Sequence, residues 1–84
     1  MNKTSLYKFI KRTPENEEFR KSVEGAALML KKNQGRLYIV NPITNVIIWL
    51  TSDIQEEERS DDKKLLTIRT VNSVYEFEKF AETI

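Results

Sequence analysis

The chain has 84 residues and contains neither cysteine nor histidine. Their absence excludes disulfide bonds, zinc sites built from cysteine and histidine, thiol nucleophiles and imidazole bases. Glycine occurs only twice, which excludes the glycine-rich loops that cradle phosphate groups in nucleotide-binding proteins. With these motifs excluded, we expect a protein that is not an enzyme and that holds neither a cofactor nor a metal ion.

Long hydrophobic runs are also missing. No stretch approaches the roughly 18 apolar residues that a membrane-spanning helix requires. The N-terminal residues carry a charge every few positions and lack the apolar segment and cleavage site of a signal peptide. We therefore expect a cytoplasmic protein that does not associate with a membrane.

The segment from residue 53 to residue 64 is densely charged, and we expect an exposed loop there. Ser60 and Lys63 have the spacing of a serine–lysine pair, but a lysine in such a loop would be solvated and protonated. A calcium loop of the EF-hand type needs a glycine turn, which this segment lacks. We interpret its carboxylates as an acidic surface that contacts a partner. They belong to Asp53, Glu56, Glu57, Glu58, Asp61 and Asp62.

The net charge of +1 conceals an asymmetry between the two halves of the chain. Residues 1–40 have nine basic and four acidic residues, whereas residues 41–84 have five basic and nine acidic ones. A basic half can bind nucleic acid, although the pI of about 7.9 is low for that class of protein. The residues considered as nucleic-acid contacts are Lys8, Lys11, Arg12, Lys31, Lys32 and Arg36.

The clearest helical pattern runs from about residue 15 to residue 32. Thr13 and Pro14 are typical of a helix start, where threonine caps the helix and proline takes its first position. Apolar residues then recur at spacings of three and four, which predicts one apolar helix face. They are Phe19, Val23, Ala26, Ala27 and Leu30.

The two ends of the chain are predicted as further helices. Ser73 and Glu76 match a capping box, which favours a helix over residues 73–83. Residues 1–12 form an N-terminal segment whose pattern fits either a short helix or a strand. We favour the short helix for this segment, because Thr4 or Ser5 could cap it.

Strands are predicted at 36–40, 45–51 and 65–71, where β-branched and aromatic residues are enriched. Asn41 and Pro42 are typical of a turn, so the first two strands are expected to form a hairpin. The complete prediction is a small single domain, residues 1–84, of the α+β class. Its element order is α-α-β-β-β-α, with a three-stranded antiparallel meander packed on helices.

The middle strand raises a question, because residues 46–50 are all apolar. Side chains alternate between the two faces of a strand, so both faces of this strand are apolar. Residues 1–12, a second copy of the chain or a different protein could cover the second face, and we favour a homodimer. The residues expected at this interface are Tyr38, Val40, Ile47 and Trp49.

These exclusions leave a small non-enzymatic binding protein that acts through protein–protein interaction with an unidentified protein. Small proteins without catalytic residues are common among phage and mobile-element accessory proteins, which inhibit or redirect a host protein. We expect a protein of this kind. The alternative is a nucleic-acid-binding regulator that uses the basic N-terminal half, and steep salt dependence of binding would distinguish it.

Overall fold

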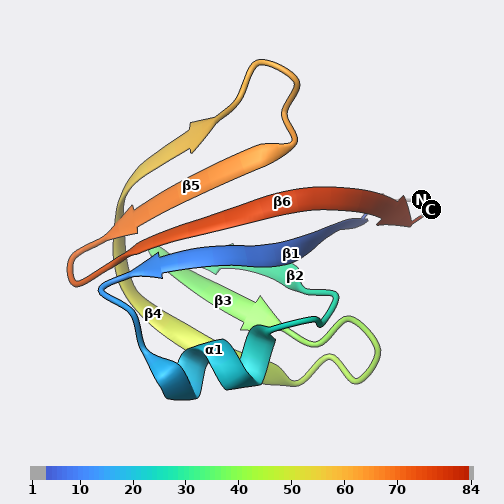
Figure 1. Cartoon of the computed structure of the whole chain (residues 1–84), viewed down its shortest axis with the longest axis horizontal. Helices are drawn as coiled ribbons and strands as arrows, with labels where there is room; N and C mark the ends of the chain where they lie inside the picture. The colour runs from blue at the N-terminus through green and yellow to red at the C-terminus, as the bar shows by residue number, and fades with distance from the viewer. Residues whose placement is uncertain (1–3, 84) are drawn as a thin grey trace.

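The computed structural model describes residues 4–83, which form one antiparallel sheet and one short helix (Figure 1). The spatial order of the six strands is β1-β6-β5-β4-β3-β2. The expected α+β fold with a three-stranded meander is therefore wrong. The elements are β1 (Thr4–Thr13), α1 (Glu17–Val23), β2 (Met29–Asn33), β3 (Arg36–Val40), β4 (Ile47–Arg59), β5 (Leu65–Thr70) and β6 (Val74–Thr83).

The sheet rolls up until its two edge strands meet. Tyr7 on β1 and Leu28, just before β2, exchange two backbone hydrogen bonds of 2.9 Å each. Figure 1 shows β1 and β2 side by side at this contact. In this arrangement, called the roll below, the sheet turns its apolar face inward and covers that face itself.

β4 is the longest strand and belongs to both halves of the roll. Its first part pairs with β3 and its second part pairs with β5. A register shift between Ile54 and Glu56 marks the bend between these two pairings. Residues 53–59, which we expected in a charged loop, are therefore strand. Pairing with two neighbouring strands outweighs the low strand propensity of their charged side chains.

The helix expected over residues 15–32 is wrong, because α1 has only seven residues. Asn16 caps it, and the Asn16 side chain accepts a hydrogen bond of 2.9 Å from the Phe19 backbone N–H. The helix ends just before Gly25, whose φ of +72° is a left-handed conformation that glycine adopts without strain. The apolar spacing that suggested one long helix arises from a short helix followed by the strand β2.

Both ends of the described chain are strands, and they pair with each other. β1 and β6 run antiparallel, with Phe9 opposite Phe77. Ser73 does not cap a helix; its carbonyl accepts a hydrogen bond of 2.8 Å from the Thr70 N–H across a tight turn. The helix expected over 73–83 is therefore wrong, and so is the short helix favoured for the N-terminal segment. The strand alternative for that segment is confirmed from residue 4 onward, and residues 1–3 lie outside the described residues. Aromatic and acidic residues alternate along β6, and this period of two buries one face of the strand.

The turn between β2 and β3 explains why this hairpin forms where it does. Gln34 and Gly35 have φ values of +53° and +78°. Two successive positive φ angles are characteristic of a type I′ turn, whose twist matches that of the flanking strands. The Gly35 position thus favours a hairpin whose first strand, β2, takes up residues that we had expected in the helix over 15–32.

α1 closes one end of the roll with the ring of Phe19. This ring is fully buried and meets the rings of Phe9, Trp49 and Tyr75 edge-on, at centroid distances of 5.0, 5.0 and 5.4 Å. Edge-to-face contacts of this kind add to the stabilisation that hydrophobic burial provides. The other members of the buried cluster are Tyr7, Val23, Leu28, Leu37, Ile39, Leu66, Ile68 and Phe77.

Replacing Phe19 with alanine is expected to lower the free energy of unfolding by about 3–5 kcal/mol, because it leaves a cavity among three aromatic rings. Urea denaturation followed by circular dichroism measures this loss. Phe80→Ala is the matched control, since the same atoms are removed from a side chain that is 45% exposed. An equal loss of unfolding free energy in the two variants would contradict the role of Phe19 in closing this end of the roll.

Candidate functional site

The end of the roll away from α1 carries charged side chains on its inner face. Glu57 and Arg59 on β4 lie opposite Ile68 and Leu66 on β5. Cross-strand partners share one face of a sheet. Ile68 and Leu66 are buried, with 1% and 2% of their surface exposed. Glu57 and Arg59 therefore point into the roll. We call the end of the roll that they line the open end.

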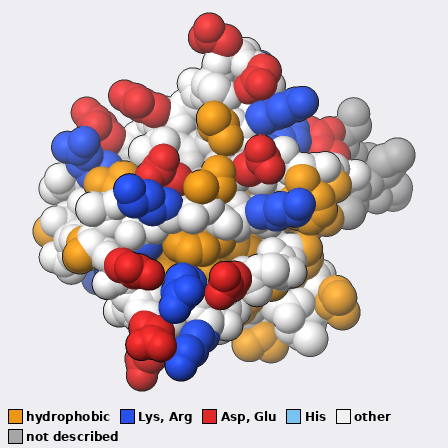
Figure 2. Space-filling view, in the orientation of Figure 1, with side chains coloured by type: hydrophobic (Ala, Val, Ile, Leu, Met, Phe, Trp, Pro, Cys, Tyr) orange, Lys and Arg blue, Asp and Glu red, His pale blue; other side chains and the backbone are white. Residues whose placement is uncertain are grey.

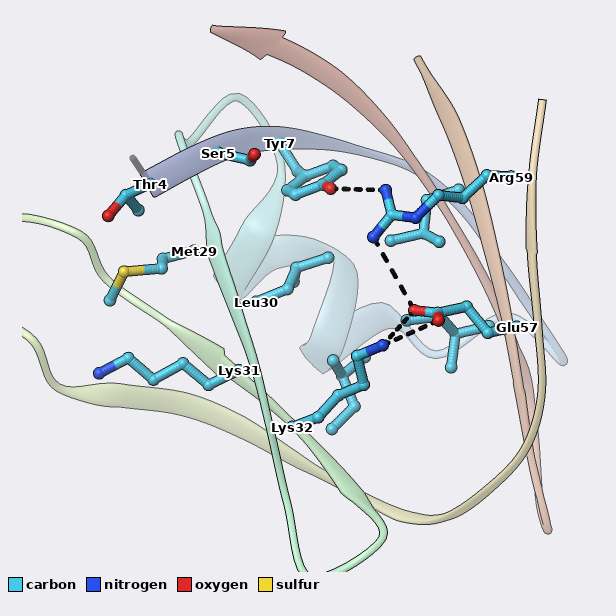
Figure 3. Close-up of a pocket in the computed structure, with 12 residues that line it drawn as sticks. Thr4, Ser5, Tyr7, Met29, Leu30, Lys31, Lys32, Glu57 and Arg59 are labelled. Atoms are coloured by element: carbon cyan, nitrogen blue, oxygen red, sulfur yellow. Dashed lines mark hydrogen bonds and ion pairs between the residues drawn. The ribbon is translucent and has the colours of Figure 1, made fainter. Parts of the chain in front are cut away.

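A chain of polar contacts joins these two residues to both edges of the sheet. The ammonium of Lys32 donates to the two carboxylate oxygens of Glu57 at 2.7 and 2.8 Å. The guanidinium of Arg59 lies 4.0 Å from the same carboxylate and donates to the Tyr7 hydroxyl at 3.0 Å. Figure 3 shows how the four side chains converge from β1, β2 and β4. The contacts thus bridge the opening that remains between β1 and β2.

A cavity of about 330 Å³ lies beside these charged groups. β1 and β2 separate beyond the Tyr7–Leu28 contact, and the cavity occupies this gap (Figure 3). Apolar side chains from β2, β3 and β5 also line the cavity. They are Met29, Leu30, Leu37, Leu66 and Ile68. The open end therefore combines an apolar wall with a small number of charged groups, as is typical of small-molecule sites.

The electrostatics of the open end favour an anion. Lys32 and Arg59 contribute two positive charges and Glu57 one negative charge. The hydrogen bond with the Tyr7 hydroxyl raises the pKa of Arg59 further above its usual value, against the opposing effect of partial burial. Arg59 therefore remains charged, and the inward-facing groups carry one uncompensated positive charge.

A second candidate site is an apolar surface on the outside of the roll. Lys31, Tyr38 and Leu50 are neighbours in register across β2, β3 and β4, and Ile47 lies opposite Val40 in the next row. On this surface, the exposed large apolar side chains lie in or beside the β3–β4 loop. Ile43 is 92% exposed, Val46 60%, Ile47 52% and Leu50 44%. We call these four residues the outer patch. Figure 2 shows apolar side chains in the region of the β3–β4 loop.

The structure separates the four residues that sequence analysis grouped into one interface. Tyr38 and Val40 lie on the outer face of β3, where Tyr38 is half-buried and Val40 is buried. Ile47 belongs to the outer patch. Trp49 points into the roll, where its ring packs against Phe19. Three of the four residues thus lie on the outer face of the sheet, where Val40 is buried, and the fourth packs against the core.

The basic residues considered for nucleic-acid binding do not gather into one surface. Lys32 bonds to Glu57 inside the roll, and Lys31 donates to Asn45 on the outer face at 3.2 Å. The remaining members are spread along β1 and β3. Lys8 lies over the Phe80 ring and Lys11 is exposed. The guanidinium of Arg12 lies over the rings of Phe19 and Tyr75, and Arg36 pairs with Asp53.

The acidic residues also divide between different surfaces. Asp53 and Glu56 form ion pairs with Arg36 and Arg69 at 3.3 and 3.7 Å. Glu57 points inward and Glu58 is exposed, while Asp61 and Asp62 lie in the turn between β4 and β5. Within residues 4–83, no three acidic side chains are arranged so that they could hold a metal ion.

Ser60 and Lys63 do not form a serine–lysine pair. The Ser60 hydroxyl donates to the Asp62 carboxylate at 2.5 Å, and the Lys64 backbone N–H donates to the same oxygen at 3.0 Å. The bond from Ser60, with a smaller contribution from Lys64, lowers the pKa of Asp62 below its usual value. The hydroxyl therefore has a structural role in the turn.

Neither Tyr7 nor Arg59 was identified as a site residue from the sequence. Arg59 follows three glutamates, a pattern that suggests a solvated loop. The signal that could have revealed it is the period of two, since a strand through residue 59 places Glu57 and Arg59 on one face. Tyr7 stood in a segment that we interpreted as helical, so its position at the sheet edge was not expected.

Comparison with protein-family models, curated proteins and solved structures finds nothing that matches this chain. Within the described residues, no helix has the length and apolar character needed to cross a membrane. The function must therefore be inferred from the two surfaces themselves.

The ion pair between Lys32 and Glu57 is partly exposed, so its energetic coupling is expected to be below about 1 kcal/mol and to decrease in high salt. A double-mutant cycle of Lys32→Gln and Glu57→Gln, measured by urea unfolding, tests this. The neighbouring residue Glu58 points to the other face, so a cycle of Lys32→Gln with Glu58→Gln should show no coupling. Equal coupling in both cycles would contradict the inward direction of Glu57.

Ser60→Ala is expected to raise the pKa of Asp62 towards its usual value, because the substitution removes the main hydrogen bond to the carboxylate. A lowered pKa contributes stability at neutral pH that is lost as the pH falls through the folded-state pKa. In the variant, this loss should be smaller and should be complete at a higher pH, because the folded-state pKa lies closer to the unfolded-state value. Carboxyl NMR titration measures the midpoint, and Ser22→Ala, in α1, should leave it unchanged. An unaltered Asp62 midpoint in Ser60→Ala would refute the assignment.

Proposed function

We propose that the chain is a non-enzymatic binding protein that acts through protein–protein contact at the outer patch. The observation that carries this proposal is the exposure of four large apolar side chains close together on one hairpin. Exposed apolar clusters are uncommon on small monomeric proteins and typically mark interaction surfaces. A partner that covers Ile43, Val46, Ile47 and Leu50 would remove this apolar surface from water.

A second copy of the chain is the partner that this surface fits best. Arg36 and Asp53 lie opposite each other on β3 and β4, in the row next to Tyr38. A surface with one cation and one anion at its edge is complementary to itself, because a twofold axis can place Arg36 of one copy against Asp53 of the other. The homodimer would cover the outer face of the most apolar strand segment.

Nucleic-acid binding receives less support from the geometry. The basic residues of the N-terminal half are spread over the inner face, the outer face and the aromatic core contact of Arg12. Phosphate recognition along a backbone requires several cations on one continuous surface. Protein contact, by which an accessory protein could inhibit or redirect another protein, is therefore the function that we propose.

Light scattering on a sizing column is expected to give a mass near twice 9.9 kDa for the wild-type chain. Ile47→Asp should run as a folded monomer, because a charge buried without a partner at the interface is strongly unfavourable. Val71→Asp is the matched control, since Val71 is 57% exposed but lies outside the outer patch, and it should remain a dimer.

Circular dichroism establishes that each variant retains its strand content. A wild-type chain that remains monomeric as the protein concentration rises would overturn the homodimer. Dissociation of both variants to the same extent would assign the interface to a surface other than the outer patch.

A further inference from the structure

The open end contains a positively charged group, the guanidinium of Arg59, that the nearest carboxylate neutralises only in part. Lys32 binds both oxygens of Glu57, so these two charges compensate each other. The guanidinium of Arg59 lies 4.0 Å from Glu57, which is too long for a hydrogen bond. The Arg59 side chain is 41% exposed, so water solvates its charge, and an incoming anion can reach the guanidinium.

Hydrogen-bond donors remain available beside the cavity. A guanidinium has five N–H donors, of which Arg59 donates one to the Tyr7 hydroxyl. The Tyr7 oxygen accepts this bond, so its own O–H can still donate to a further acceptor. Planar carboxylates match the fork of an arginine, with two parallel hydrogen bonds of the strong, charge-assisted kind. Arg59 and Tyr7 together therefore form a donor set suited to one carboxylate group.

The rest of the cavity suits an apolar body attached to that carboxylate. Met29 and Leu30 on β2 are partly exposed and offer an apolar surface to the cavity, and the buried side chains of Leu37, Leu66 and Ile68 lie behind them. Figure 3 shows Leu30 between Tyr7 and Lys32, facing the gap that the cavity occupies. The volume of about 330 Å³ is at the lower end of the range found for small-molecule sites.

We propose that the open end binds a small organic acid, whose carboxylate pairs with Arg59 and Tyr7 and whose apolar chain or ring packs on Met29 and Leu30. Lys32 and Glu57 position this site by bridging β2 to β4. The site lies on the inner face of the sheet and is independent of the outer patch.

The test is a titration of the full chain with sodium octanoate, followed by ¹⁵N NMR and isothermal calorimetry. Saturable binding is expected, with shift changes in Tyr7, Leu30 and Arg59. Octanol and octylammonium have the same apolar chain without the carboxylate, and both should bind at least about tenfold more weakly, the factor that a lost charge-assisted bond predicts. Equal affinity for the three probes would overturn carboxylate recognition, and an absence of octanoate binding would overturn the site.

Two variants locate the binding to named groups. Arg59→Gln should weaken octanoate binding about tenfold or more, while Tyr7→Phe should weaken it to a smaller extent and keep the ring in the core. Arg69→Gln is the matched control, because Arg69 lies on β5 and pairs with Glu56 on the outer face. Unchanged affinity in both Arg59→Gln and Tyr7→Phe, or an equal loss in Arg69→Gln, would refute the proposed contacts.

Discussion

The closure of the sheet upon itself is the constraint on which the rest of this structure depends. A sheet with one apolar face must have that face covered, and the helix within residues 4–83 has only seven residues. The paired hydrogen bonds between Tyr7 and Leu28 join the two sheet edges, so that opposite parts of the inner face pack against each other. The burial of Leu37, Ile68 and Phe77 follows from this contact rather than from a second layer.

Closure also makes the two ends of the roll chemically different and leaves one surface uncovered. Phe19 seals one end with aromatic contacts, whereas Glu57 and Arg59 line the other, where partial exposure to water makes inward-facing charges tolerable. The apolar run in β4 is explained by the same geometry. Its inner side packs on Phe19, whereas Ile47 on its outer side is 52% exposed.

The sequence predicted the secondary structure well where residue preferences agree with the setting of a strand. It predicted it less well where tertiary contacts determine which structure forms. The strand at 36–40 was predicted correctly, because β-branched and aromatic residues there agree with its buried setting. The helical spacing through Leu30 was misleading, since residues of a short helix and of a strand happened to fall in one pattern. The period of two places Glu57 and Arg59 on one face of a strand, but which face points inward depends on the register shift after Ile54, which the sequence does not reveal.

The pairing of β1 with β6 has a consequence for the order in which the protein folds. Thr4 lies opposite Thr83, so this pairing closes nearly the whole length of the described chain. Contacts between sequence neighbours, such as the β2–β3 and β4–β5 hairpins, have a far lower entropic cost and can form first. The joining of β1 to β6 and to Leu28 is then a late step. Until it occurs, the apolar inner face is accessible to other chains, which makes aggregation the main competitor of folding.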